Sequence, residues 1–135
     1  MDKYEMIQEK IKKMHIALEN MEDEYRTSRE KLEQELSQLD DYRLQLQQLC
    51  DEFSDISYHF LMKENIDQDI YKEFNSMLEN YLEATDTSYR EKLHKWEERD
   101  DELTTNYKKQ HSKMEDDLEE AYFQRRKAFD EQYGE

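Results

Sequence analysis

Apolar residues recur every seven positions through the first half of the chain. Steps of seven from Tyr4 give an unbroken row: Tyr4, Ile11, Leu18, Tyr25, Leu32, Leu39, Leu46, Phe53 and Phe60. A companion row reads Ile7, Met14, Met21, Ser28, Glu35, Tyr42, Leu49 and Ile56, with polar breaks only at Ser28 and Glu35. Two such rows form the seam of a coiled coil, because spacing of about 3.5 residues keeps one stripe facing a partner helix. The pattern predicts a long helical arm over about 3–62.

The second half carries a looser version of the same pattern. Its apolar row runs through Ile70, Phe74, Met77, Tyr81, Tyr89, Leu93, Trp96, Leu103, Tyr107, Met114, Leu118, Ala121 and Phe129, with Arg125 as a polar interruption. The spacing slips in places from seven to eleven residues, and such slips relax a left-handed supercoil. We therefore expect a second arm over about 70–133 that wraps its partner less regularly.

A short polar stretch, 63–69, separates the two patterns and predicts the bend. Asn65 followed by Gln68 resembles a helix-starting capping box, and Asp67 or Asp69 would serve as the cap equally well. There is no Pro, and Gly134 is the only Gly, so sheets with many tight turns and glycine-built phosphate loops are excluded. The sequence predicts an all-α fold with one domain over 1–135, a long antiparallel two-helix coiled-coil hairpin.

Charge gives a separate argument for the hairpin. A bend near residue 66 or 67 sets Arg125 near Glu9, and Asp40 and Asp41 near Lys92. Flanking opposite charges fix the orientation of paired helices, although each exposed pair contributes only about 0–1 kcal/mol. This pairing favours a hairpin over one uninterrupted rod.

The net charge of -16 disfavours nucleic acid and anionic membranes, since both attract basic surfaces. A single cysteine, Cys50, cannot form an internal disulfide. Neither a signal peptide nor a transmembrane helix is indicated at the charged N-terminus, so direct membrane insertion is not expected. We expect a cytoplasmic protein, and export by a route without a cleaved signal stays open.

Residues that could carry chemistry are few. Glu91 and His94 match the Glu-x-x-His spacing of a metal-binding helix turn, but the chain has no second such pair. Cys50 has no neighbouring base, and His111 beside Ser112 lacks a glycine-built oxyanion site. We expect no catalytic site, no metal site and no cofactor.

An excess of apolar residues surrounds the bend and is more informative. Besides the seam positions, this end carries Tyr58, Leu61, Met62, Ile66, Tyr71, Leu78 and Leu82. Wide apolar coverage is typical of a helix with more than one neighbour. The residues predicted to bind a partner protein are Phe53, Ile56, Tyr58, Phe60, Tyr71, Phe74 and Leu78. In the alternative, Leu61, Met62 and Ile66 simply plug the end of the hairpin.

A smaller aromatic group lies near the C-terminus beside the basic run 125–127. It consists of Tyr122, Phe123, Phe129 and Tyr133. This group either attaches the second arm to Tyr4 and Ile7, which we favour, or contacts an acidic partner.

In outline, the chain resembles the small α-helical partner proteins of LXG toxins in the Gram-positive type VII secretion system. The resemblance covers length, acidity, the lack of Pro and the two heptad-rich arms, and is most specific at FSDISYHF (53–60) and MEDDLEEAYFQRRKAF (114–129). Trp96 is followed by Glu97 and Glu98, so the chain resembles the partner type without a Trp-x-Gly motif. We find no C-terminal Tyr-x-x-x-Asp/Glu export signal, which leaves co-export with a client open.

The resemblance implies an adaptor or chaperone that binds the helical N-terminal LXG domain of a toxin and targets it to the secretion system. A second small helical partner often accompanies such proteins. Two other hypotheses remain. The first is a structural coiled coil that associates with itself, as a homodimer or larger scaffold, and the second is a bundle-type metalloenzyme with bound iron or manganese.

Overall fold

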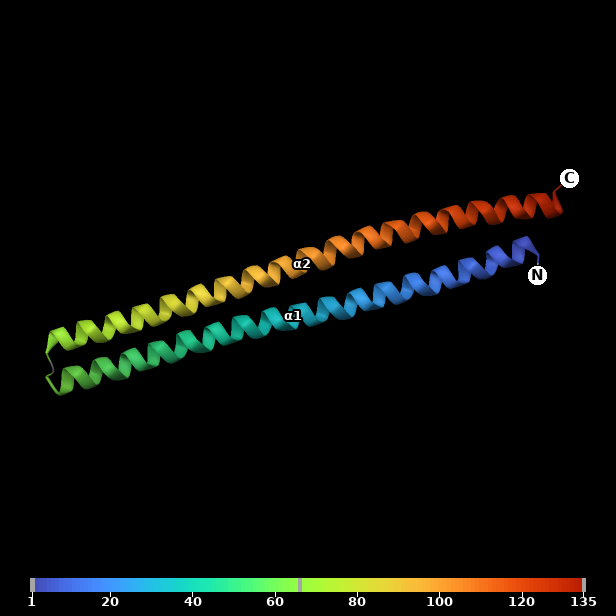
Figure 1. Ribbon diagram of the computed structural model, residues 1–135. Coiled ribbons are helices and arrows are strands. Elements are labelled where there is room, and N and C mark those ends of the chain that lie inside the picture. The colour runs from blue at the N-terminus through green and yellow to red at the C-terminus, as the bar shows by residue number, and fades with distance from the viewer. Residues whose placement is uncertain (1, 66, 135) are drawn as a thin grey trace. The chain divides into compact units, whose positions relative to one another are not determined.

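The computed structural model describes residues 2–65 and 67–134 and contains two helices in this part of the chain. They are α1 (Lys3–Lys63) and α2 (Gln68–Tyr133), joined by a short bend (Figure 1). The described residues include no strand. The prediction of an all-α hairpin is therefore confirmed for them. Ile66, which we counted among the apolar residues at the bend, lies outside the described residues.

Local hydrogen bonds mark where the helices begin and end. The Asp2 carboxylate accepts a hydrogen bond from the Glu5 amide (2.8 Å), which caps the start of α1. Beyond its end, Asn65 adopts φ 52°, a left-handed conformation that Asn tolerates better than most residues. The Asp67 carboxylate accepts from the Asp69 amide (3.2 Å), so Asp67 caps α2 and not Asn65 or Asp69.

The chain divides into two compact units. The first unit contains Met1–Lys31 and Arg99–Glu135, and the second contains Leu32–Glu98. Each unit pairs a segment of α1 with a segment of α2. Contacts pair Tyr4 with Phe129 and Tyr25 with Tyr107 in the first unit. In the second they pair Leu32 with Trp96 and Phe53 with Phe74, so the two helices run in opposite directions within each unit.

The first unit buries most of its predicted apolar rows between the helices, although Phe129 of the second row is 48% exposed. Ile11, Leu118 and Ala121 form a small core, against which Ile7, Met14 and Leu18 pack. The rings of Tyr25 and Tyr107 stack with centroids 3.9 Å apart. Arg125, the polar interruption in the second row, donates a hydrogen bond to the Gln8 side chain (2.8 Å), beside the predicted Glu9.

The second unit is held by a mixture of apolar and polar contacts. Leu32 and Cys50 are buried, and the Trp96 indole donates a hydrogen bond to the Leu32 carbonyl (2.7 Å). Arg43 pairs with Asp86 (2.9 Å) and lies over the Tyr89 ring. The Tyr89 hydroxyl donates a hydrogen bond to the Asp40 carboxylate. The predicted partner of Asp40 was Lys92, which lies three residues after Tyr89. Helix pairing in this unit is thus offset by about one turn from the predicted register.

Near the bend, the predicted seam turns largely toward solvent. Tyr42, Leu49, Phe53, Ile56 and Phe60 are 54–68% exposed, although the heptad rows place all five against α2. The period of the α-helix explains the difference, because at about 3.6 residues per turn a seven-residue row drifts about 20° per heptad around the helix. Leu32, Leu39 and Leu46 are buried or half-buried, whereas Phe53 and Phe60 in the same row are exposed. Cys50, Ser54, Ser57 and Leu61 are the less exposed positions here.

No apolar run in the described helices is long enough to cross a membrane.

Candidate protein-binding face

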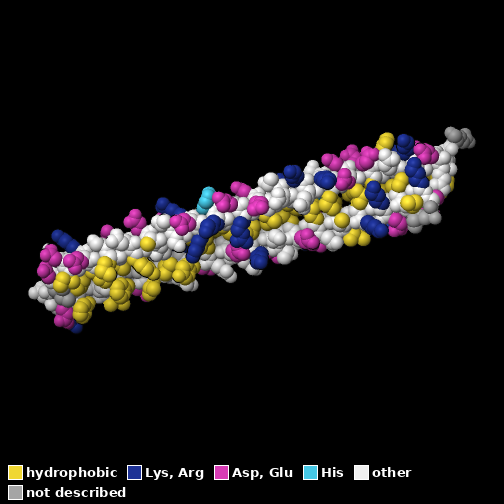
Figure 2. Space-filling view, in the orientation of Figure 1, with side chains coloured by type: hydrophobic (Ala, Val, Ile, Leu, Met, Phe, Trp, Pro, Cys, Tyr) yellow, Lys and Arg dark blue, Asp and Glu magenta, His cyan; other side chains and the backbone are white. Residues whose placement is uncertain are grey.

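Large apolar side chains form two exposed stripes in the second unit, one on each helix. The stripe on α1 comprises Tyr42, Leu49, Phe53, Ile56 and Phe60, and the stripe on α2 comprises Ile70, Met77 and Tyr81, each at least half exposed. Figure 2 shows hydrophobic side chains gathered toward the bend end of this unit. We call the two stripes together the apolar face.

Both stripes lie on the same side of the second unit. Their spacing of three, four or seven residues keeps each stripe on one side of its own helix. The Phe53 ring contacts the half-exposed Phe74 ring, with centroids 5.5 Å apart. Tyr42 and Tyr81 line a common hollow between the helices. The apolar face is therefore one continuous surface that spans α1 and α2.

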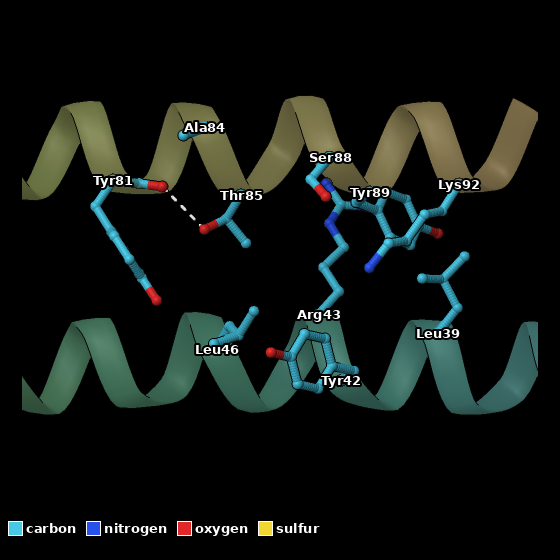
Figure 3. Close-up of a pocket in the computed structure, with 10 residues that line it drawn as sticks. All are labelled: Leu39, Tyr42, Arg43, Leu46, Tyr81, Ala84, Thr85, Ser88, Tyr89 and Lys92. Atoms are coloured by element: carbon cyan, nitrogen blue, oxygen red, sulfur yellow. Dashed lines mark hydrogen bonds between the residues drawn. The ribbon is translucent and has the colours of Figure 1, made fainter.

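The hollow lies at the end of the apolar face farther from the bend (Figure 3). Its volume is about 270 Å³. Its lining consists of Leu39, Tyr42, Arg43, Leu46, Tyr81, Ala84, Thr85, Ser88, Tyr89 and Lys92. Ala84 is a small side chain on α2, so the backbone of that helix can be approached closely between the two tyrosines.

Exposure on this scale has an energetic consequence. Burying a large aliphatic or aromatic side chain contributes about 1.5–3 kcal/mol, and the eight residues of the two stripes are left largely in water. Contiguous apolar patches beyond a few hundred Å² are uncommon on monomeric soluble proteins and mark interaction sites. Covering the face with another apolar surface would therefore lower the free energy of the system.

The seven residues predicted to bind a partner are divided among three places. Phe53, Ile56 and Phe60 lie on the apolar face, with Phe74 at its centre. Tyr58 and Tyr71 touch each other (centroids 5.8 Å) on the opposite flank, since Tyr58 is about 200° around α1 from Ile56 and from Phe60. Leu78 is half-buried.

Sequence reasoning placed several residues of the apolar face elsewhere. Tyr42, Leu49, Ile70, Met77 and Tyr81 were assigned to the seam, and Ala84 was not singled out. The signal that could have found them is the drift of a seven-residue row around a helix of about 3.6 residues per turn.

Acidic side chains border the apolar face. Glu52 and Glu73 immediately precede Phe53 and Phe74, and one residue along a helix is about 100° around it. Both carboxylates are exposed and lie on the outer edges of the face, one on each helix. The border is therefore negative where the two rings meet.

The titratable clusters elsewhere serve structural contacts. His111 contacts Glu22 (3.1 Å) and Glu115 (3.3 Å) in the first unit. His94 contacts Glu98 (2.9 Å), not the Glu91 of the predicted Glu-x-x-His pair. Burial together with the negative charge of nearby Glu22 raises the pKa of Tyr107. Among the described residues, no group of three or more His, Cys, Asp or Glu side chains is placed to hold a metal ion.

The C-terminal aromatic group contacts α1 within the first unit. The Phe129 ring packs on Tyr4 (5.8 Å) and on Tyr133 (5.0 Å). The Tyr122 hydroxyl and the His15 imidazole are 2.6 Å apart and share a hydrogen bond. These contacts agree with attachment of the second arm, which was the favoured interpretation. Phe123 is 58% exposed.

Comparison with protein-family models finds no match, and comparisons with curated proteins and with solved structures find none either.

Proposed function

We propose that the protein is an adaptor that binds helices of another protein and carries out no catalysis. The observation that supports this proposal is the apolar face, where eight large side chains of the second unit lie exposed in two parallel stripes. A client helix with its own apolar stripe would cover this surface, as in other helix-in-groove complexes.

The client class follows from the resemblance described above. We propose an LXG-domain toxin, bound through its helical N-terminal domain and targeted to a type VII secretion system, with a second small helical partner as a further component. Binding would take place in the cytoplasm. As a finer description of the fold, we propose that α1 and α2 pair as an antiparallel coiled coil in the first unit, where Ile11 and Leu118 of the two apolar rows share a core.

Affinity purification of the tagged protein from its native cell, followed by mass spectrometry, tests the proposal. We expect stoichiometric recovery of a protein with a helical N-terminal domain. Phe60→Asp and Phe74→Asp should each reduce that recovery at least tenfold, because each places a carboxylate in an apolar contact. Phe123→Asp is the matched control, since Phe123 (58%) is as exposed as Phe60 (57%) but belongs to the first unit. Full recovery with both face variants would refute the assignment.

A self-associating scaffold is the second candidate function. The regular heptad rows of the first arm favour it, because such rows also drive homo-oligomers. Recovery of the protein alone, as a tight and salt-tolerant oligomer, would support this candidate against the adaptor.

A further inference from the structure

The apolar face is long enough to bind one extended helix. The α1 stripe runs from Tyr42 to Phe60, which corresponds to roughly 27 Å at a rise of about 1.5 Å per residue. A partner helix of about 18–20 residues would lie along it, over both the α1 and the α2 stripe. This arrangement would complete a bundle of three helices and cover both stripes at once.

The negative charge around the apolar face indicates which kind of helix can bind there. Residues 40–63 and 68–92 contain eleven Asp or Glu and five Lys or Arg. Arg43 and Arg90 both contact Asp86. Glu52 and Glu73 lie on the edges of the face, so a second copy of this chain would place carboxylates near carboxylates there. A helix with Lys or Arg on both sides of its apolar stripe has the opposite charge and complements these edges.

The hollow gives the site a point of specificity. The hollow has a volume of about 270 Å³ and is open to solvent, so water fills it in the free protein. Its small residue Ala84 lies between Tyr81 and Tyr42 along the helices (Figure 3), and such a concave site with aromatic walls is typical of the pocket for a binding hot spot. A Leu, Met or Phe of the partner would displace that water.

We propose that the apolar face binds a single amphipathic helix, basic along both edges of its apolar stripe, which inserts one large apolar side chain into the hollow above Ala84. The inference rests on the proposed adaptor function, to which it adds the chemistry of the partner segment.

Synthetic peptides test the chemistry directly. Two labelled 20-residue helical peptides share one Leu stripe and differ only at the flanking positions, which are Lys in one and Glu in the other. Fluorescence anisotropy with the full chain at low salt should give at least tenfold tighter binding of the Lys peptide, and this preference should shrink as salt is added. Equal affinities for the two peptides would overturn the charge argument.

Substitutions test where the Lys peptide binds. Ala84→Trp fills the hollow and should weaken binding at least tenfold, whereas Ala17→Trp, at an exposed Ala in the first unit, should leave it unchanged.

Glu52→Lys with Glu73→Lys should remove the preference for the Lys peptide. Glu24→Lys with Glu119→Lys is the control with the same change in net charge. Circular dichroism confirms that every variant remains helical.

The results separate this inference from the proposed function. Unchanged peptide binding by Ala84→Trp would overturn the hollow as the contact point. A cellular client that Ala84→Trp still recovers in full would also overturn it, while leaving the adaptor function intact. Sedimentation of the protein alone at low salt as a dimer that Ala84→Trp dissociates would show that the occupant is a second copy.

Discussion

The Asp2 carboxylate shows how single side chains act across the helix pair of the first unit. It accepts hydrogen bonds from the Gln132 side chain (2.8 Å) and from the Glu5 amide (2.8 Å). These bonds stabilise the ionised form and lower the pKa of Asp2 below its ordinary value of 3.8, with the Gln132 bond as the main cause. The carboxylate thus connects the start of α1 to the end of α2.

Gln132→Ala should therefore raise the pKa of Asp2 toward 3.8, as followed by NMR titration of its carboxyl carbon. Because the folded pKa is depressed, the stability that this group contributes is present above pH 3.8 and is lost as pH falls through the lower, folded value. Gln124→Ala is the control, since the Gln124 side chain donates to Glu120. An unshifted Asp2 titration in Gln132→Ala would show that the hydrogen bond does not form in solution.

At the level of helices, the bend depends on the backbone of one residue. Asn65 has φ 52°, in the left-handed region where a β-branched side chain is strained. The adjoining turn places the Asp67 carboxylate at the start of α2. Conformation at Asn65 and capping at Asp67 together determine where α1 ends and α2 begins.

Asn65→Gly should leave the free energy of unfolding nearly unchanged, because Gly adopts positive φ readily. Asn65→Val should lower it by about 1–2 kcal/mol, measured by urea unfolding with circular dichroism. Glu64→Val, at the neighbouring exposed position, controls for the loss of a polar side chain. If both valine variants lose the same stability, the backbone explanation fails.

The helices could be predicted from the sequence more fully than the surfaces they bury. The interval between α1 and α2 falls inside the predicted bend, 63–69. The bend could be predicted because both apolar rows stop at this polar, turn-prone stretch. Ile11 and Leu118 lie in the core of the first unit, as the rows indicate. Phe53 and Phe60 are more than half exposed because the direction that a heptad position faces depends on supercoiling, which the pattern alone does not specify.

The candidate site was predicted in part for the same reason. The excess of aromatic and aliphatic residues near the bend indicated a surface there, and Phe53, Ile56, Phe60 and Phe74 do lie on the apolar face. Tyr58 and Tyr71 lie on the other flank, since a count of apolar residues does not say on which side each one falls. The hollow above Ala84 depends on small side chains in three dimensions and leaves no mark in the apolar pattern.

For the molecule as a whole, high net charge opposes the self-association that an apolar face favours. At a net charge of -16, two copies repel each other at low ionic strength. Salt shortens the range of that repulsion from about 10 Å at 0.1 M to about 3 Å at 1 M, while apolar attraction persists.

Sedimentation equilibrium of the isolated protein should therefore show a monomer at about 20 mM salt and weak dimerisation at about 1 M salt. Phe60→Asp should suppress the dimer at high salt, and Phe123→Asp should not. A tight oligomer at every salt concentration would contradict this balance and would favour the scaffold function.

Cys50 provides a chemical probe of local opening in the second unit. Its thiol is the only one in the chain and is buried among the less exposed positions of α1. A thiol reagent can reach the sulfur only when the helices separate locally, so the rate of labelling measures how often this contact opens. A client that covers the apolar face would slow that reaction without touching the sulfur.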